Sequence, residues 1–135
     1  VGTRGNCAQV VLKPTRNFMK IDQVMDSIKA KGKTPLLHAI DSALNLVESF
    51  HKQNKFLTNL LVVISDGKVN VPFRNSMNED LNWLGKRIKK LSLNNFVVDS
   101  NQKFNRSFLL QKMVRIFDGR YMVMEDTLLQ GKISL

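Results

Sequence analysis

The sequence predicts an α/β domain with a doubly wound, mostly parallel sheet, and two observations support this fold class. Short apolar runs typical of strands alternate with segments of helical periodicity about three turns long, which is the pattern of βαβ units. The strand expected over 60–65 is apolar from Leu60 to Ile64 and rich in β-branched residues, as expected of a parallel strand buried on both faces. The 135 residues suffice for one domain, and no repeat or linker divides them.

The strand over 60–65 ends in Asp66-Gly67, and this position makes Asp66 a candidate site residue. In open α/β sheets, ligands bind just outside the carboxyl ends of the strands. A second apolar run, over 96–98, ends in the same way in Asp99. The alternative interpretation is that Asp66-Gly67 only forms a turn.

The first part of the chain predicts a short edge strand and a helix. Residues 8–12 are expected to form a short strand, and the proline that follows ends it because proline cannot donate to a strand ladder. A helix is expected over 18–30, with Asn17 as its N-cap. Its apolar residues recur at helical spacing and are Phe18, Ile21, Met25 and Ile28.

Thr34-Pro35 predicts the start of the next helix, which continues to about residue 50. Thr34 is expected as the N-cap and Pro35 at the first helical position. His38 lies opposite the apolar stripe and is therefore expected at the surface, where a functional role is the less favoured interpretation. The stripe consists of Leu37, Ile40, Leu44 and Val47.

The second half of the chain predicts two further helix–strand pairs. Helical spacing of apolar residues predicts a helix over 78–90, and a short buried strand is expected over 96–98. Another helix begins near residue 108. Gly119 is expected to cap its end, and the last strand is expected over 121–123.

Charge and cysteine content limit the function classes. The net charge of +10 would suit an anionic partner such as nucleic acid. The densest basic group lacks the interleaved aromatic residues of a single-strand binder and is interpreted as a solvated helix face. The single Cys7 cannot form an internal disulfide, which predicts a reducing, cytoplasmic compartment. No membrane span or signal peptide is expected. The basic group is Lys86, Arg87, Lys89 and Lys90.

Several catalytic sites are excluded because their motifs are missing. Gly32-Lys33-Thr34 resembles the end of a phosphate-binding loop, but the upstream glycine and a preceding buried strand are absent. The chain has no Cys or His cluster for zinc and no Gly-x-Ser-x-Gly elbow, so a self-contained enzyme is poorly supported. The hydroxyl of Thr34 and the carboxylate of Asp66 remain as oxygen donors for Mg²⁺, which usually keeps several waters. The alternative role for Thr34 is that of a helix cap.

Two segments resemble a known family. They are GKTPLLHAI at 32–40 and LVVISDGKVNVP at 61–72, and they are similar to the von Willebrand factor A-type domain of magnesium chelatase D subunits and their cobalt-chelatase relatives. Further matches occur in the family's order, so the resemblance covers nearly the whole chain. They are TRG at 3–5, VVLKPTR at 10–16, VVDS at 97–100 and GRY at 119–121.

The resemblance implies a metal-ion-dependent adhesion site, in which three loops bind Mg²⁺. Thr34 matches the threonine of the second loop and Asp66 the aspartate of the third, while His38 and Asn70 would line the partner-binding rim. The first loop, Asp-x-Ser-x-Ser, does not occur in this sequence. Residues 1–135 are therefore expected to form a single, N-terminally incomplete A-type domain. It would lack the first helix and the first central strand, and an apolar strand would be left without a neighbour.

The implied function is that of a non-catalytic interaction module in a chelatase complex. By resemblance, an ATPase subunit of the AAA+ class and a porphyrin-binding subunit complete this complex. It inserts Mg²⁺ into protoporphyrin IX for tetrapyrrole and chlorophyll biosynthesis, in the cytoplasm or the plastid stroma. Two alternatives stay open. One is a degenerate, metal-free A-type scaffold or a gene fragment without activity, and the other is a basic nucleic-acid-binding domain, which rests on charge alone.

Overall fold

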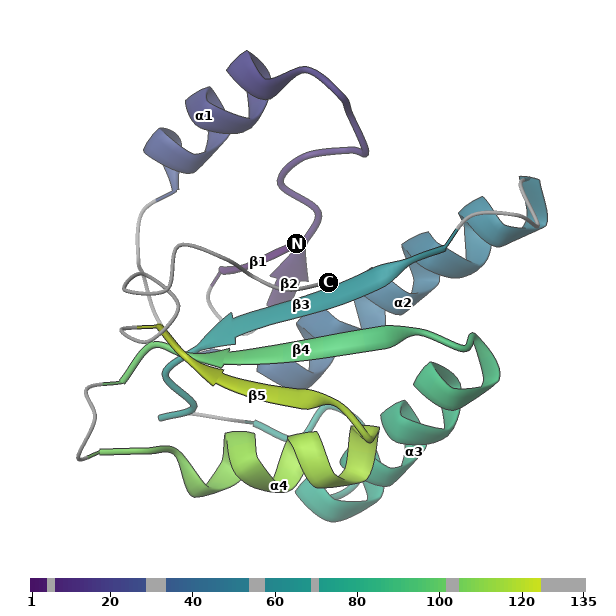
Figure 1. Cartoon of the computed structure of the whole chain (residues 1–135), viewed down its shortest axis with the longest axis vertical. Helices are drawn as coiled ribbons and strands as arrows, with labels where there is room; N and C mark the ends of the chain where they lie inside the picture. Colours follow the sequence, from purple (N-terminus) through teal and green to yellow (C-terminus); the bar gives the residue numbers. More distant parts are fainter. Residues whose placement is uncertain (5–6, 29–33, 54–57, 69–70, 102–104, 125–135) are drawn as a thin grey trace.

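Three parallel strands, with three helices packed against one face, form the main body of the computed structural model (Figure 1). The structure describes residues 1–4, 7–28, 34–53, 58–68, 71–101 and 105–124. In chain order its elements are β1 (Gly2–Arg4), β2 (Cys7–Gln9), α1 (Phe18–Ser27), α2 (Leu36–Gln53), β3 (Leu60–Ser65), α3 (Met77–Lys90), β4 (Asn94–Asp99), α4 (Phe108–Phe117) and β5 (Arg120–Val123).

The central sheet has the strand order β3-β4-β5, and both pairings are parallel. β3 and β4 are in register from Leu60 opposite Asn94 to Ser65 opposite Asp99. Their carboxyl ends therefore meet at one edge, and Asp66 follows directly there. This parallel sheet with flanking helices confirms the predicted α/β class.

The amino-terminal residues form an antiparallel hairpin that the sequence did not predict. β1 pairs with β2 from Gly2 opposite Gln9 to Arg4 opposite Cys7, and the hairpin lies against α2 (Figure 1). The strand expected over 8–12 is thus shorter and begins one residue earlier.

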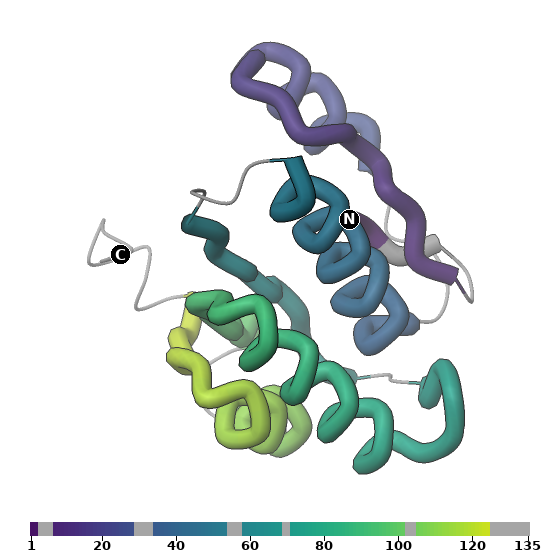
Figure 2. Tube along the Cα trace, turned by 90° about the vertical axis from the view of Figure 1, so that its right-hand side faces the viewer, coloured from purple at the N-terminus to yellow at the C-terminus, as the bar shows by residue number. Residues whose placement is uncertain are grey.

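The hydrophobic core lies between the sheet and helices α2, α3 and α4, which cover the same face (Figure 2). Val63 and Val97 are paired in the sheet and belong to this core. Each helix adds fully buried leucines, and burial of each such side chain contributes roughly 1.5–3 kcal/mol. These include Leu37, Leu44, Leu81, Leu84 and Leu110.

The opposite face of β3 is open, so the prediction of a strand buried on both faces is wrong. Burial alternates along β3, and Val62 and Ile64 are 41% and 60% exposed. Their partners in β4, Phe96 and Val98, are buried. Within the described ranges β3 pairs with β4 alone, which makes it an edge strand. This agrees with the expected loss of a neighbouring strand.

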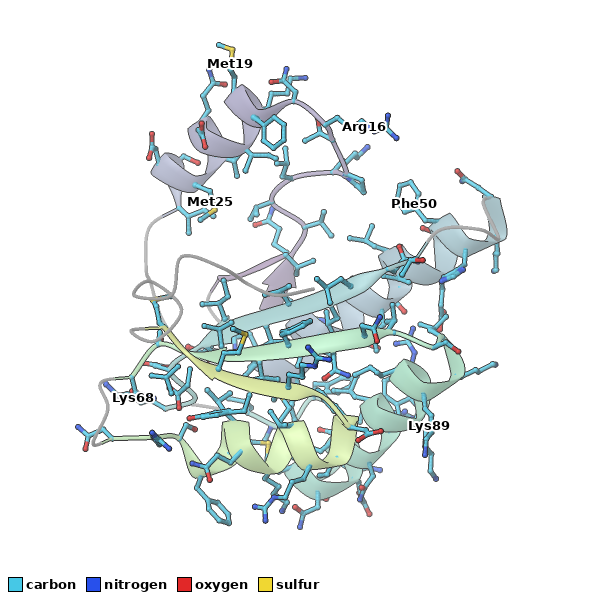
Figure 3. All side chains as sticks on the ribbon, in the orientation of Figure 1. Arg16, Met19, Met25, Phe50, Lys68 and Lys89 are labelled. Carbon is cyan, nitrogen blue, oxygen red and sulfur yellow. The ribbon has the colours of Figure 1, made fainter. Side chains whose placement is uncertain are left out.

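Helix α1 stands apart from the sheet, with its apolar residues exposed (Figure 1). Asn17 accepts a hydrogen bond from the backbone N–H of Lys20 (3.3 Å), which confirms the predicted cap. However, no residue of the helix is buried, and Phe18 is 79% exposed. Figure 3 shows Met19 pointing away from the rest of the chain. Periodicity therefore predicted the helix but not its surroundings.

The end of α4 differs from the prediction. Asp118, not Gly119, takes the left-handed conformation that ends the helix (φ 51°). Position 119 has no room for a side chain, because a Cβ there would lie 2.8 Å from Cγ of Asn95, so glycine is required. The side chain of Asn95 is held in this place by a hydrogen bond that its amide donates to the carbonyl oxygen of Phe117 (3.0 Å).

Candidate functional site

Asp66 lies in a tight turn directly after β3. Its Oδ1 accepts a hydrogen bond from the backbone N–H of Lys68 (3.1 Å), and the hydroxyl of Ser65 accepts one from the N–H of Gly67 (3.0 Å). Gly67 has φ +64°, and a Cβ there would lie 2.9 Å from Cβ of Ser107, so only glycine fits. Among the described residues, the second carboxylate oxygen of Asp66 has no hydrogen-bond partner. Asp66 therefore forms the turn and still offers one free oxygen.

The buried carboxylate of Asp99 anchors this turn from the neighbouring strand. Asp99 is 0% exposed and accepts hydrogen bonds from the hydroxyl of Tyr121 (2.6 Å) and the backbone N–H of Ser107 (2.9 Å). The side-chain amide of Asn101 donates both to Oδ1 of Asp99 (2.7 Å) and to the backbone oxygen of Asp66 (2.6 Å). One amide thus joins the carboxyl ends of β3 and β4.

Sequence reasoning missed this network. The signal was present, because the apolar run over 96–98 also ends in an aspartate. What the sequence could not show is that Asp99 is fully buried and holds a loop, whereas Asp66 is only partly buried. The partner Asn101 lies only 2 residues further along the chain, whereas Tyr121 lies 22 residues further and is brought to Asp99 by the fold.

The ionisation of the buried Asp99 and the partly buried Tyr121 reflects their hydrogen bond. Burial raises the pKa of Asp99, but hydrogen bonds from Tyr121, Ser107 and Asn101 outweigh this effect and hold the pKa below its ordinary value of 3.8. Burial, together with the hydrogen bond to Asp99 and its negative charge, raises the pKa of Tyr121 to about 12. Asp99 is therefore ionised and Tyr121 protonated at neutral pH.

Thr34 precedes α2 and is not its N-cap, which corrects the prediction. The helix begins at Leu36, whose N–H donates to the carbonyl oxygen of Thr34 (2.9 Å), and the N–H of Ala39 donates to Pro35. Within the described ranges, the hydroxyl of Thr34 forms no hydrogen bond. A capping role would have occupied this oxygen, so the hydroxyl is free for another partner.

A cavity of about 220 Å³ brings Thr34 and the end of β3 together. Its lining includes Thr34 and Ser65, the residue directly before Asp66, and its walls come from α2, β3 and the amino-terminal residues Val1 and Gly2. A free hydroxyl and a half-free carboxylate near this cavity are hard oxygen donors, which suit Mg²⁺ that keeps several of its waters. The oxygen donors of Thr34 and Asp66 are thus of the type that suits such an ion and would supply part of its ligands, although Asp66 itself does not line the cavity.

His38 is half-buried and holds the hairpin, so the expectation of an exposed surface histidine is wrong. Its Nδ1 accepts a hydrogen bond from the backbone N–H of Ala8 in β2 (3.2 Å). Its ring stacks on Phe73, with ring centroids 6.1 Å apart, and Phe73 in turn contacts Trp83 on α3 (5.8 Å). His38 thus links the hairpin to the loop before α3.

Replacing His38 with Leu is expected to destabilise the hairpin by about 1–2 kcal/mol, because the N–H of Ala8 loses its acceptor. Hydrogen exchange at Ala8, measured by NMR, should become faster. His38→Asn is the matched variant, since its side-chain oxygen can still accept at this position, and it should retain more of the protection. Equal protection of Ala8 in the wild type and His38→Leu would contradict this role.

The structure also bears on Asn70 and on groups of side chains that could hold a metal ion. Asn70, predicted to line a partner-binding rim, lies outside the described residues. In the part of the chain that the structure describes, no group of three or more His, Cys, Asp or Glu side chains is placed to hold a metal ion.

None of the described helices is long and apolar enough to cross a membrane.

Comparisons with known proteins agree with this architecture. No family model matches the chain. The magnesium-chelatase 60 kDa subunit of Rhodobacter capsulatus is 21% identical over 126 residues, which are 90% of this chain and 22% of that subunit. The chain thus spans less than a quarter of the curated relative that it matches.

Among solved structures, the chain is similar to the SpRpn10 VWA domain, with a TM-score of 0.61 and 19% sequence identity. The match covers 86% of this chain and 58% of that one. At this identity the structural similarity shows the fold alone. The sequence similarity is what links the chain to the chelatase subunit. The chain therefore has a von Willebrand factor A fold, and the two comparisons together support a domain of the kind found in chelatase D-type subunits.

Proposed function

We propose that this chain is a protein-interaction module of a magnesium-chelatase-type D subunit, with a resident Mg²⁺ held by Thr34 and Asp66. The two side chains would supply a hydroxyl and a carboxylate oxygen, and waters or a partner's carboxylate would complete the shell. This resident ion is distinct from the Mg²⁺ that the complex would insert into protoporphyrin IX as a substrate.

One observation carries the proposal: Thr34, whose hydroxyl is not used as a helix cap, lines a cavity together with Ser65, the last residue of β3. The hydrogen bond from Asn101 to the backbone oxygen of Asp66 fixes the turn that bears the second donor (2.6 Å). Such preorganisation favours binding because less ordering is needed when the ion arrives. A bound cation would then offer an open coordination position to an acidic side chain of a partner subunit.

The similarity to the 60 kDa chelatase subunit supports the choice of complex. In that assignment the partners are an ATPase subunit of the AAA+ class and a porphyrin-binding subunit, and the module itself has no catalytic residue. ATP-driven insertion of Mg²⁺ would be the activity of the whole complex, in the cytoplasm or the plastid stroma.

The metal site is tested by isothermal titration of the full chain with Mg²⁺ and Mn²⁺. We expect binding that weakens at least about tenfold in Thr34→Val and in Asp66→Asn, because even the partners of metal ligands change affinity by roughly 10–100-fold. Both substitutions nearly preserve side-chain volume. Asp22→Asn, at an exposed position of α1, is the control and should leave the affinity unchanged.

Binding that survives both Thr34→Val and Asp66→Asn would contradict the proposed ligands. Absence of binding in the wild-type chain, with circular dichroism showing an intact fold, would instead favour the metal-free scaffold.

A further inference from the structure

A basic groove lies between α3 and α4, away from the site at Asp66. It has a volume of about 850 Å³, within the range of roughly 300–1,000 Å³ that is typical of binding clefts. Its lining includes Lys86 and Lys89 from α3 and Arg115 from α4. We propose that this groove binds an acidic polypeptide segment of a partner protein.

The three cations are exposed and uncompensated. Within the described ranges, Lys86, Lys89 and Arg115 have no ion-pair partner, and none of the three is buried. Arg87 on the same helix behaves differently, because it pairs with Asp41 and with Glu48 (2.9 Å) on α2. The fold therefore neutralises the cation that faces α2 and leaves the groove cations available.

Close helix packing sets the shape of the groove. Gly85 lies where α3 meets α4, and a Cβ there would be 3.0 Å from the backbone oxygen of Ile116. Lys86 and Lys89 are three residues apart and so share one side of α3, beside Gly85. Ile116, which is only partly buried, adds apolar surface to the groove next to the cations. This combination fits a peptide that alternates carboxylates with apolar side chains.

The same lining disfavours a nucleic acid. Asp118, an exposed carboxylate, also lines the groove and would repel a continuous phosphate backbone. The aromatic residue of the lining, Phe117, is buried, so it offers no platform on which bases could stack. A peptide can place its carboxylates next to the lysines and avoid Asp118.

The groove and the proposed metal site lie at opposite ends of the sheet. Asp66 follows the carboxyl end of β3, whereas the groove includes Asn94 and Asp118, at the amino ends of β4 and β5. Figure 3 shows Lys68, two residues after Asp66, on one side of the molecule and Lys89 on the other. A partner in the groove would leave the metal site accessible, so the two proposals can fail independently.

The test uses the full chain and a short fluorescein-labelled peptide of Glu with interspersed Leu, followed by fluorescence anisotropy. The double variant Lys86→Glu/Lys89→Glu should weaken binding at least about tenfold, since like charges placed together oppose association strongly. The control Lys13→Glu/Lys20→Glu changes the net charge equally at exposed positions outside the groove, and should weaken binding less than about twofold.

A third variant should act in the opposite direction. Asp118→Asn removes the repelling carboxylate, and asparagine tolerates the left-handed conformation of this position, so the acidic peptide should bind about twofold more tightly.

Three results would overturn the proposal. Equal weakening in both double variants would show attraction to net charge only. Equal binding of a peptide with Gln in place of Glu would show that carboxylates are not recognised. Labelled duplex DNA that loses more affinity than the peptide in Lys86→Glu/Lys89→Glu would make the groove a nucleic-acid site.

Discussion

Replacing Asp99 with Ala is expected to lower the free energy of unfolding by about 3–5 kcal/mol, because several donors lose one buried acceptor. The donors are the hydroxyl of Tyr121, the backbone N–H groups of Ser107 and Asn101, and the amide of Asn101. Urea unfolding monitored by circular dichroism measures this loss. It is a large fraction of the roughly 5–15 kcal/mol that stabilises a typical domain.

The pH dependence separates this role from a simple loss of packing. The pKa of Asp99 is held below 3.8, so its hydrogen bonds contribute stability above that pH, and the contribution is lost as the pH falls through the lower pKa of the folded state. The stability difference between wild type and Asp99→Ala should therefore narrow in acid. Asp22→Ala, at an exposed position of α1, is the control with little expected effect. A difference that stays constant from neutral pH to well below 3.8 would contradict the role of the charge.

The chain by itself is expected to associate through the open side of β3. An apolar edge strand with unpaired backbone groups promotes strand pairing between molecules. Placing Lys at Val62 and Ile64, which are 41% and 60% exposed, should raise the concentration at which association begins by at least about tenfold. Sedimentation velocity over a range of concentrations measures this change.

A matched variant distinguishes β3 from the other exposed apolar surface. Met19→Lys/Met25→Lys adds the same charge on α1, where these side chains are 72% and 64% exposed. It should raise the association threshold less than the β3 variant. If both double variants raise the association threshold equally, net charge and not β3 controls association. A wild-type chain that is monodisperse and melts cooperatively as a monomer would contradict the prediction entirely.

Periodicity predicted the elements of this chain well because it depends on local spacing. The strand over 60–65 has the expected bounds, and Leu37, Ile40 and Leu44 are buried as the stripe of α2 requires. The same reasoning failed for α1, whose stripe is equally regular but has no buried residue. A stripe shows that a helix is amphipathic, and it does not show that a partner covers it.

The candidate site was predictable only at the level of single positions. The strand end identified Asp66, and the helix start identified Thr34, although Thr34 is not the N-cap that it was expected to be. His38 was placed at the surface because helix geometry describes only its own helix, whereas its contacts come from Ala8 in the hairpin and Phe73 in a distant loop. Contacts between side chains and residues 30 or more positions away in the sequence depend on tertiary structure, which local sequence patterns do not encode.

The chain contains one tryptophan, and its surroundings make it a spectroscopic reporter. The guanidinium groups of Arg74 and Arg87 lie over the ring of Trp83, 4.3 and 5.0 Å from its centroid, and the ring contacts Phe73. Because Arg87 is paired with α2, the emission of Trp83 should change when α2 and α3 separate. Intrinsic fluorescence can therefore follow unfolding of the helical layer without any added label.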